Sequence, residues 1–159
     1  RLQEPEPMAM EVAFPKLVFD KKVSVFDQQG WELKGKWADF GKKQAKISGT
    51  AGDEISFSFE GTGASIVGNW MKDGGKADVY VDGQMKRTID CYFNFAKQEH
   101  WNMNLYHITN LPEGKHTVKL VVKGEKRPES GGTNVYISEA LVFKTADKIN
   151  ENFKFSFQK

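Results

Sequence analysis

The chain has 159 residues, a length at which one domain buries a sizeable core without disulfide bonds. Lys and Arg total 23 against 21 Asp and Glu, so the net charge of +2 gives no field that would gather nucleic acid or an anionic membrane. A single cysteine, Cys91, excludes an internal disulfide and a zinc site built on paired cysteines. No stretch approaches the roughly eighteen apolar residues of a membrane span, so we expect no membrane insertion.

The two ends of the chain differ in composition from its middle. The opening residues are rich in Pro and Glu, so residues 1–10 are expected to be a linker from an upstream domain. Residues 11–145 are expected to form one domain. Residues 146–159 follow as a tail in which Phe153, Phe155 and Phe157 alternate with polar residues. This tail is either an edge strand or a segment that pairs with another part of the protein.

Alternation of apolar and polar residues dominates the first half of the domain. The first predicted strands are, in chain order, Val12–Phe19, Val23–Phe26, Trp31–Trp37 and Ala45–Ser48. In the next segment Ile55, Phe57 and Phe59 alternate with polar residues, which predicts a strand with these three side chains on one buried face. Gly61–Gly63 is then expected to make a turn into a further strand.

The second half repeats this pattern. Ala77, Val79 and Val81 alternate with polar residues, and Asp82-Gly83 supplies two residues that tolerate positive φ in a hairpin turn. The remaining predicted strands are Met85–Tyr92, Asn104–Ile108, Lys115–Lys123 and Asn134–Lys144, the middle two joined by a turn at 111–114. In Lys115–Lys123, Val118, Leu120 and Val122 are predicted to face inward. About ten strands without crossover helices predict an all-β fold, an antiparallel two-sheet β-sandwich.

The sequence contains no readable catalytic constellation. Gly63–Gly68 has one residue too many for the Gly-x-Ser-x-Gly nucleophile elbow, and it lies in a predicted strand. The histidines, His100, His107 and His116, are spaced too irregularly to preset a metal site on one strand. We therefore expect no catalytic residues and no enzymatic activity of the chain alone. Residues distant in sequence could still converge to make an independent hydrolase.

Polar and aromatic residues gather instead in three predicted loops, 68–75, 94–104 and 124–132. These mix an aromatic ring with charged and amide groups, which suits a polyhydroxylated ligand whose apolar face stacks on Trp. The candidate ligand-binding residues are Trp70, Lys72, Asp73, His100, Trp101 and Arg127. The alternative for each Trp is that it covers an edge of the core. We expect loops 68–75 and 124–132 to form one functional surface.

Four strings between Asp53 and Phe143 resemble the galactose-binding-like β-sandwich modules attached to secreted bacterial carbohydrate-active enzymes. They are Phe57–Gly63, Gly74–Gly83, Leu111–Thr117 and Val122–Pro128. More narrowly, the loops Gly68–Gly75 and Gly124–Ser130 are similar to those of a C-terminal domain that follows an ADP-ribosylglycohydrolase-type domain in Bacteroidetes proteins.

This resemblance implies a jelly-roll sandwich with ligand sites on loops at one end. It implies no cofactor, although some related modules hold a structural calcium ion through backbone carbonyls. The resemblance thus predicts a non-catalytic accessory module, periplasmic or extracellular, with a glycan and a parent catalytic domain in the same chain as partners. The alternative is a structural domain that packs against and orients a parent hydrolase and binds no ligand of its own.

Overall fold

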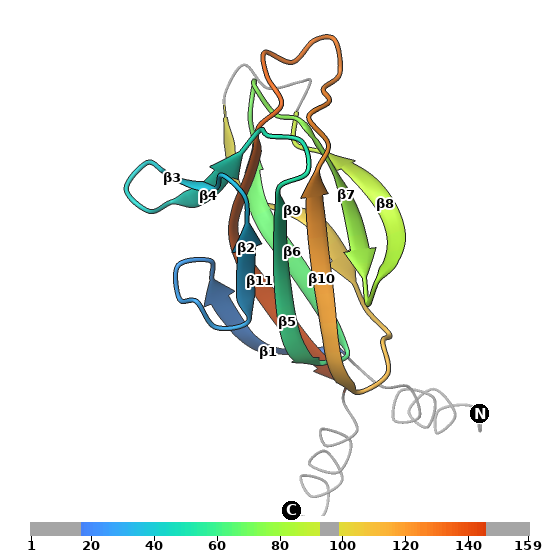
Figure 1. Ribbon diagram of the computed structural model, residues 1–159. Coiled ribbons are helices and arrows are strands. Elements are labelled where there is room, and N and C mark those ends of the chain that lie inside the picture. The colour runs from blue at the N-terminus through green and yellow to red at the C-terminus, as the bar shows by residue number, and fades with distance from the viewer. Residues whose placement is uncertain (1–16, 93–98, 146–159) are drawn as a thin grey trace, which may run out of the picture.

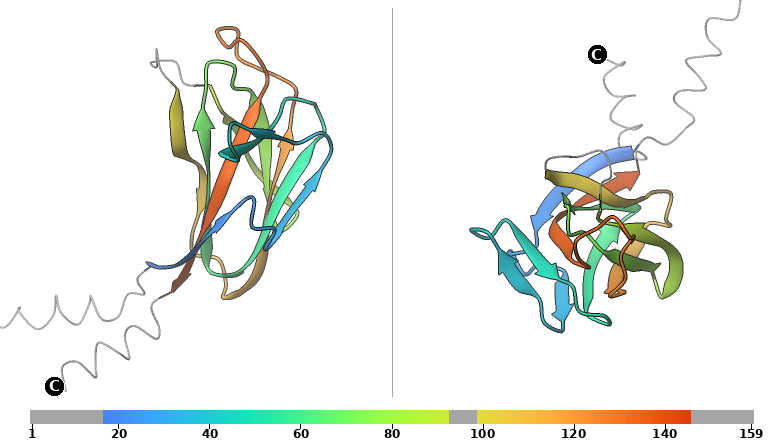
Figure 2. Two further views of the ribbon diagram at one scale, coloured as in Figure 1. Left: turned by 90° about the vertical axis from the view of Figure 1, so that its left-hand side faces the viewer. Right: turned by 90° about the horizontal axis from the view of Figure 1, so that it is seen from above.

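The computed structural model describes residues 17–92 and 99–145, which form strands, turns and loops. The strands are β1 (Leu17–Ser24), β2 (Trp31–Lys34), β3 (Ala38–Phe40), β4 (Ala45–Ser48), β5 (Glu54–Gly61), β6 (Gly63–Trp70), β7 (Lys76–Val81), β8 (Gln84–Asp90), β9 (His100–Ile108), β10 (Gly114–Val122) and β11 (Val135–Thr145). Two antiparallel sheets pack face to face (Figures 1 and 2), which confirms the predicted all-β sandwich. Within these ranges no helix is long and apolar enough to span a membrane.

The chain passes between the sheets at most of its connections, as in a jelly roll. The six-stranded sheet, called sheet A, has the order β3-β4-β11-β6-β9, and β1 also pairs with β11. Along one edge of β11, β4 pairs with residues 135–137 and β1 with residues 139–145. The five-stranded sheet B has the order β2-β5-β10-β7-β8. One edge of the sandwich is therefore formed by β2 in sheet B and by the β3–β4 hairpin in sheet A.

The core lies between the two sheets and uses the faces that alternation predicts. Alternate residues of β5, β7 and β10 are buried there, which confirms the predicted inward faces Ile55, Phe57, Phe59, Ala77, Val79, Val81, Val118, Leu120 and Val122. Sheet A contributes Ala64, Ile66, Ile137, Ala140 and Val142 from its own inner face. A fold of this kind is stabilised mainly by the apolar area removed from water between the sheets.

The predicted hairpin turn after β7 is confirmed. Asp82 and Gly83 have φ values of 50° and 84°, and Val81 pairs with Gln84 across the turn. Two successive residues with positive φ are typical of a type I′ turn, whose twist matches that of the strands it joins.

Several strand boundaries differ from the predictions. Where two strands were predicted between residues 12 and 26, the described residues form a single strand, β1, with an irregularity between Phe19 and Lys21. The polar run around that irregularity hides the continuity, because a bulge breaks the alternation without ending the strand. The short strand β3 was not predicted. The predicted tail strand, the linker and the start of the 94–104 loop lie outside the described residues.

Two of the predicted loops are shorter than expected. Strand β6 continues through Trp70, so the loop predicted at 68–75 begins only at Met71. Strand β9 begins at His100, so His100 and Trp101 lie in a strand and not in a loop. The register between β6 and β9 is irregular at Ile66/Val67 and Gly68/Trp70. Bulges disturb the period-two pattern, so the sequence pattern placed the strand ends wrongly here.

Candidate functional site

The β4–β5, β6–β7 and β10–β11 connections leave the sandwich together, at the top of Figure 1. We call this the loop end. The β6–β7 connection (71–75) and the β10–β11 connection (123–134) are joined there by backbone hydrogen bonds. Gly131 N–H donates to the Lys72 carbonyl at 2.9 Å, and Asn134 N–H donates to the Asp73 carbonyl at 3.0 Å. The two loops predicted to share a surface therefore lie side by side.

Ser130, in the β10–β11 connection, is hydrogen-bonded to the backbone of both connections. Its buried hydroxyl donates to the Gly74 carbonyl at 2.7 Å and lies 3.2 Å from the Lys72 carbonyl oxygen. The hydroxyl oxygen of Ser130 accepts a hydrogen bond from Gly132 N–H at 3.3 Å. A serine with so many backbone partners fixes both loops, since buried polar groups are costly when they lack hydrogen bonds.

Asp73 is tied into the same arrangement. Its carboxylate accepts from the Tyr136 hydroxyl at 2.7 and 2.9 Å and from the Asn134 side-chain amide at 2.8 Å. Burial raises the pKa of Tyr136, and the hydrogen bond to Asp73 raises it further, so the phenol stays protonated and donates. A carboxylate offers about four lone-pair sites. One O–H of Tyr136, shared between both oxygens, and one N–H of Asn134 bond this carboxylate, so Asp73 positions Tyr136 and Asn134.

Tyr136 belongs to a small cluster on the outer face of sheet A, separate from the main core. This outer cluster consists of Phe40, Ala45, Ile47, Met71 and Tyr136. Phe40 packs edge-on against Tyr136 with ring centroids 5.0 Å apart, and Trp101 lies against Phe40 at 5.5 Å. Phe40 and Trp101 are both only partly buried. The structure thus presents accessible aromatic surface on a rigid base.

Neighbouring groups orient the Trp101 ring. Its indole N–H donates to the Glu99 carboxylate at 3.2 Å. The next residue, Asn102, has a φ of 58°, and its backbone N–H donates at 3.1 Å to the side-chain oxygen of Asn69. Asn69 is fully buried in β6. Because this bond holds the backbone beside Trp101, it helps to fix the direction of the ring.

Trp70 and His100 lie elsewhere. They are register partners on β6 and β9 with ring centroids 6.4 Å apart, and Trp70 packs against the main core between the sheets. Trp101, in contrast, stands with the outer cluster. The two predicted tryptophans therefore do not converge on one surface.

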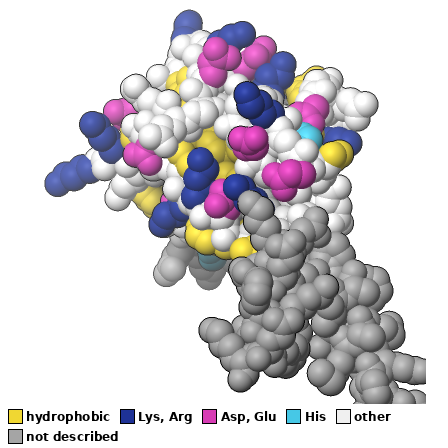
Figure 3. All heavy atoms as spheres, turned by 90° about the horizontal axis from the view of Figure 1, so that it is seen from below, with side chains coloured by type: hydrophobic (Ala, Val, Ile, Leu, Met, Phe, Trp, Pro, Cys, Tyr) yellow, Lys and Arg dark blue, Asp and Glu magenta, His cyan; other side chains and the backbone are white. Residues whose placement is uncertain are grey.

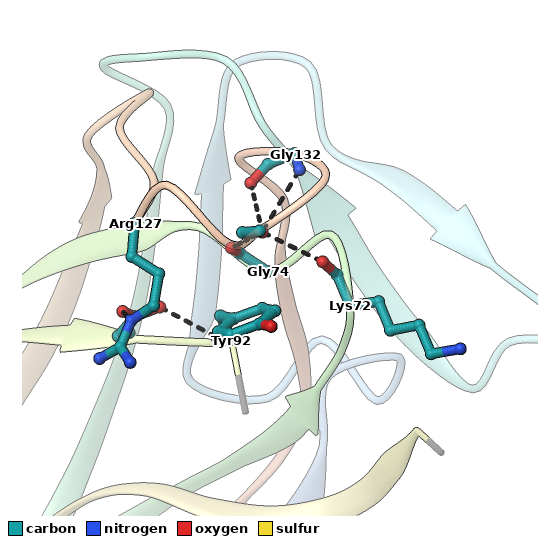
Figure 4. A network of polar contacts seen from close by, with 7 residues as sticks. Lys72, Gly74, Tyr92, Arg127 and Gly132 are labelled. Atoms are coloured by element: carbon teal, nitrogen blue, oxygen red, sulfur yellow. Dashed lines mark hydrogen bonds and ion pairs between the residues drawn. The ribbon is translucent and has the colours of Figure 1, made fainter. Parts of the chain in front are cut away.

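Arg127 and Lys72 are separated as well. The Arg127 guanidinium donates to Asp90 at 3.0 Å and lies over the Tyr92 ring, 5.8 Å from its centroid. These contacts tie the β10–β11 connection to the end of β8. Lys72 is exposed, and its side chain points away from Arg127 (Figure 4). Of the six predicted residues, Asp73 and Trp101 contact the outer cluster, whereas Trp70 pairs with His100 and Arg127 contacts Asp90 and Tyr92.

Sequence reasoning missed Phe40, Tyr136 and Asn134. The strand that carries Phe40 is only three residues long. Tyr136 follows the predicted alternation of the last strand, but its partners come from residues far apart in the chain. Because these positions have no regular spacing in the chain, the sequence alone does not indicate that they meet.

The structure also brings together a serine and a histidine. The Ser65 hydroxyl lies 2.6 Å from His107 Nδ1, across neighbouring strands β6 and β9. Within the described residues no carboxylate is hydrogen-bonded to His107, and its other contact is the Phe143 ring. Ser65 is 3% exposed and lies within strand β6. A nucleophilic serine needs an oriented base and donors for an oxyanion, and this pair lacks the orienting group among those residues.

Residues 17–92 and 99–145 contain no side-chain group suited to a metal ion. No group of three or more His, Cys, Asp or Glu side chains there could hold an ion. A calcium ion of the kind that the resemblance allows would have to use backbone carbonyls.

The family model of the carbohydrate esterase 2 N-terminal domain matches residues 38–140, well over half of the chain. The chain belongs to this family. The match begins at β3 and ends within β11, so it includes the outer cluster and both loops of the loop end. The family fits the predicted resemblance to modules of carbohydrate-active enzymes.

Among curated proteins, this carbohydrate esterase 2 N-terminal domain is similar to an A type blood alpha-D-galactosamine galactosaminidase from Flavonifractor plautii. The two are 28% identical over 120 residues, which make up 76% of this chain and 11% of that protein. The chain therefore spans only a small part of its relative.

Solved structures share the fold. A two-domain esterase (CEX) active on acetylated mannans matches with a TM-score of 0.63 and 14% identity, over 80% of this chain and 37% of that one. A family 35 carbohydrate binding module from an environmental isolate matches with a TM-score of 0.51 and 17% identity, over 79% of this chain and 93% of that one. These matches confirm the predicted sandwich of the carbohydrate-binding-module type.

Proposed function

We propose that this chain is a non-catalytic accessory module of a larger carbohydrate-active enzyme, and that it binds a glycan on the outer face of sheet A at the loop end. The observation that carries the proposal is the partly buried pair Phe40 and Trp101 on a base fixed by Tyr136 and Asp73. Aromatic rings stack on the apolar face of a sugar, and nearby amide and carboxylate groups can bond its hydroxyls. The family and the fold both support an accessory role.

The proposal includes a parent catalytic domain in the same protein and a periplasmic or extracellular location. Family membership and the esterase of similar fold favour a carbohydrate esterase as the parent. An ADP-ribosylglycohydrolase-type parent stays a prediction of the sequence. The six residues predicted from the sequence also stay a prediction, of which Asp73 and Trp101 enter the proposed surface.

A titration with mannopentaose tests the proposal, because a related two-domain esterase of similar fold was co-crystallised with this sugar. Trp101→Ala and Phe40→Ala are each expected to weaken binding to the chain about tenfold or more, as expected for an aromatic anchor. Met85→Ala is the control, since Met85 is 49% exposed but lies in sheet B, away from the outer cluster. Equal affinity of Trp101→Ala and the control, with both folded, would contradict the assignment of the surface.

We further expect the chain alone to hydrolyse neither acetyl esters nor glycosides. The Ser65–His107 pair is the arrangement that comes nearest to catalysis among the described residues. Ester turnover by the purified chain should therefore equal that of Ser65→Ala and His107→Ala. Turnover that disappears in both variants would show that this pair is an active site after all.

A structural role against the parent domain is the second candidate. Leu17 and Phe19 in β1 are large apolar side chains that are 46% and 56% exposed. Phe19 packs edge-on against Phe143 of β11 at 6.1 Å, so exposed apolar groups gather along this edge. Such a surface suits contact with another domain. Replacing Leu17 and Phe19 by Ser in the whole protein should then loosen the domains without changing mannopentaose binding.

A further inference from the structure

A surface hollow of about 390 Å³ lies at the sandwich edge formed by β2 and the β3–β4 hairpin. Its apolar lining includes Trp31 and Leu33 of β2, together with Phe26. Its polar lining includes Asp39, Lys43 and Lys46 from the hairpin. A hollow of this size can hold a small ligand, and an apolar surface bordered by a few polar groups is typical of ligand sites.

The β3–β4 hairpin separates this hollow from the outer cluster. Phe40, Ala45 and Ile47 pack in the outer cluster, whereas Asp39 and Lys46 line the hollow. Because successive side chains of a strand point to opposite faces, one short hairpin supplies residues to both places. The hollow and the Phe40–Trp101 pair therefore lie on opposite sides of the hairpin, and they are distinct surfaces.

Trp31 differs from its neighbour Trp37 in how it is held. The Trp37 indole N–H donates to the Glu54 carbonyl at 2.9 Å, as is usual for a structural tryptophan. Trp31 is held by packing on the buried ring of Phe57, with centroids 4.8 Å apart. Its buried indole N–H has no hydrogen-bond partner within the described part of the chain. An unpaired buried donor costs stability, so ring packing and not a hydrogen bond holds Trp31 at the edge of the hollow.

The polar side of the hollow combines an ion pair with a cation–π contact. Lys46 pairs with Asp39 at 2.5 Å, and its ammonium lies 5.2 Å from the centroid of the Phe26 ring. Lys43 is exposed and lines the hollow beside them. Donors and an acceptor thus stand next to an aromatic ring. This is the combination that a pyranose needs, because its hydroxyl edge is polar and one of its ring faces is apolar.

We propose that this hollow, the Trp31 groove, is a second glycan-contact site that takes one pyranose unit of a polysaccharide. This proposal rests on the proposed function, because it assumes that the chain binds glycans. Trp31 supplies the stacking surface, and Asp39, Lys43 and Lys46 bond the ring hydroxyls. Two contacts on either side of one hairpin would raise the avidity for a polymer above that for a single sugar.

The experiment follows the indole N–H signals of the full chain by NMR during titration with mannopentaose. The Trp31 and Trp101 signals should both shift saturably, while the Trp37 signal stays in place. Trp31→Phe and Trp31→Ala lack the reporting indole, so calorimetric titration with mannopentaose measures their affinity. Trp31→Phe should keep the affinity because it retains a ring, and Trp31→Ala should weaken it about fivefold or more. Lys43→Gln should weaken it by a smaller factor, and Lys42→Gln is the matched control because Lys42 does not line the hollow.

The outcomes separate the two sites. Shifts at Trp101 without shifts at Trp31 would overturn the groove and leave the proposed function standing. Shifts at Trp31 alone would support the groove and overturn the outer-face surface. No shift at either ring would overturn both. If Trp31→Ala fails to fold, the comparison of Lys43→Gln with Lys42→Gln decides, and equal groove affinities in these two variants would overturn the proposal.

Discussion

The two ends of the sandwich are built on different principles. At the loop end, the connections 71–75 and 123–134 are held by Ser130, Asp73 and backbone bonds. At the opposite turn end, β7 and β8 are joined by two residues with positive φ. The surface seen from below mixes acidic, basic and hydrophobic side chains (Figure 3). A sandwich needs only short turns to join its strands, so the long 123–134 connection at the loop end carries residues beyond those that the fold requires.

The largest effect is expected when a methyl group is inserted between the two connections of the loop end. A Cβ on Gly75 would overlap the backbone of Thr133, which cannot move aside as a flexible side chain could. Gly75→Ala should lower the free energy of unfolding by about 3 kcal/mol or more, measured by urea denaturation. At the turn end, a Cβ on Gly83 would have no atom within 4 Å. Gly83→Ala therefore strains only the backbone, because alanine disfavours a φ of +84°, and costs about 1–2 kcal/mol. Equal losses would break the contrast between the ends.

A smaller effect is expected from removing one hydroxyl. Ser130→Ala removes the donor to the Gly74 carbonyl in a buried place and the acceptor of Gly132 N–H, which should cost about 1–3 kcal/mol of stability. Ser58 is a suitable comparison, because its hydroxyl is exposed and bonds only the Thr117 hydroxyl at 2.8 Å. Ser58→Ala should change stability by about 0.5 kcal/mol or less. A Ser130→Ala protein as stable as Ser58→Ala would show that the loops hold together without the hydroxyl.

The smallest effect concerns pH at the turn end. His116 Nε2 lies 2.5 Å from the Pro112 carbonyl oxygen and Nδ1 lies 2.6 Å from the Asp82 carboxylate. Both partners only accept, so both ring nitrogens donate and the imidazolium form is favoured. The hydrogen bond to Pro112, followed by that to Asp82, raises the pKa of His116 above its ordinary value. Burial alone would raise the pKa of Asp82, but hydrogen bonds from His116 and Thr117 outweigh it and lower that pKa.

The direction of the pH dependence follows from these shifts. The stability that His116 contributes is fully present below its unfolded pKa of about 6.5 and is lost as pH rises through the higher folded pKa. The difference in unfolding free energy between the wild type and His116→Gln should therefore shrink between pH 6 and pH 9. Urea denaturation at both pH values measures it. A difference that is constant or grows with pH would contradict the charged state assigned to His116.

The sequence by itself determined the fold class, the buried faces of β5, β7 and β10, and the turn at Asp82-Gly83. These features depend on local alternation and on the φ preferences of neighbouring residues, which can be read directly from a chain. The sequence also identified residues 124–132 as a loop, whereas Trp70, His100 and Trp101 lie in strands.

Only the tertiary structure decided which of those residues meet. Trp70 and Trp101 are both candidates from the sequence. The pairing of β6 with β9 is irregular, and Trp70 packs against the core whereas Trp101 lies beside Phe40 on the outer face. Asp73 likewise looked free, yet Tyr136 and Asn134 occupy its carboxylate. A bulge of one residue reverses the side to which every later side chain points, and partners sixty residues apart are chosen by sheet pairing. For these physical reasons the site, unlike the fold, depends on the three-dimensional structure.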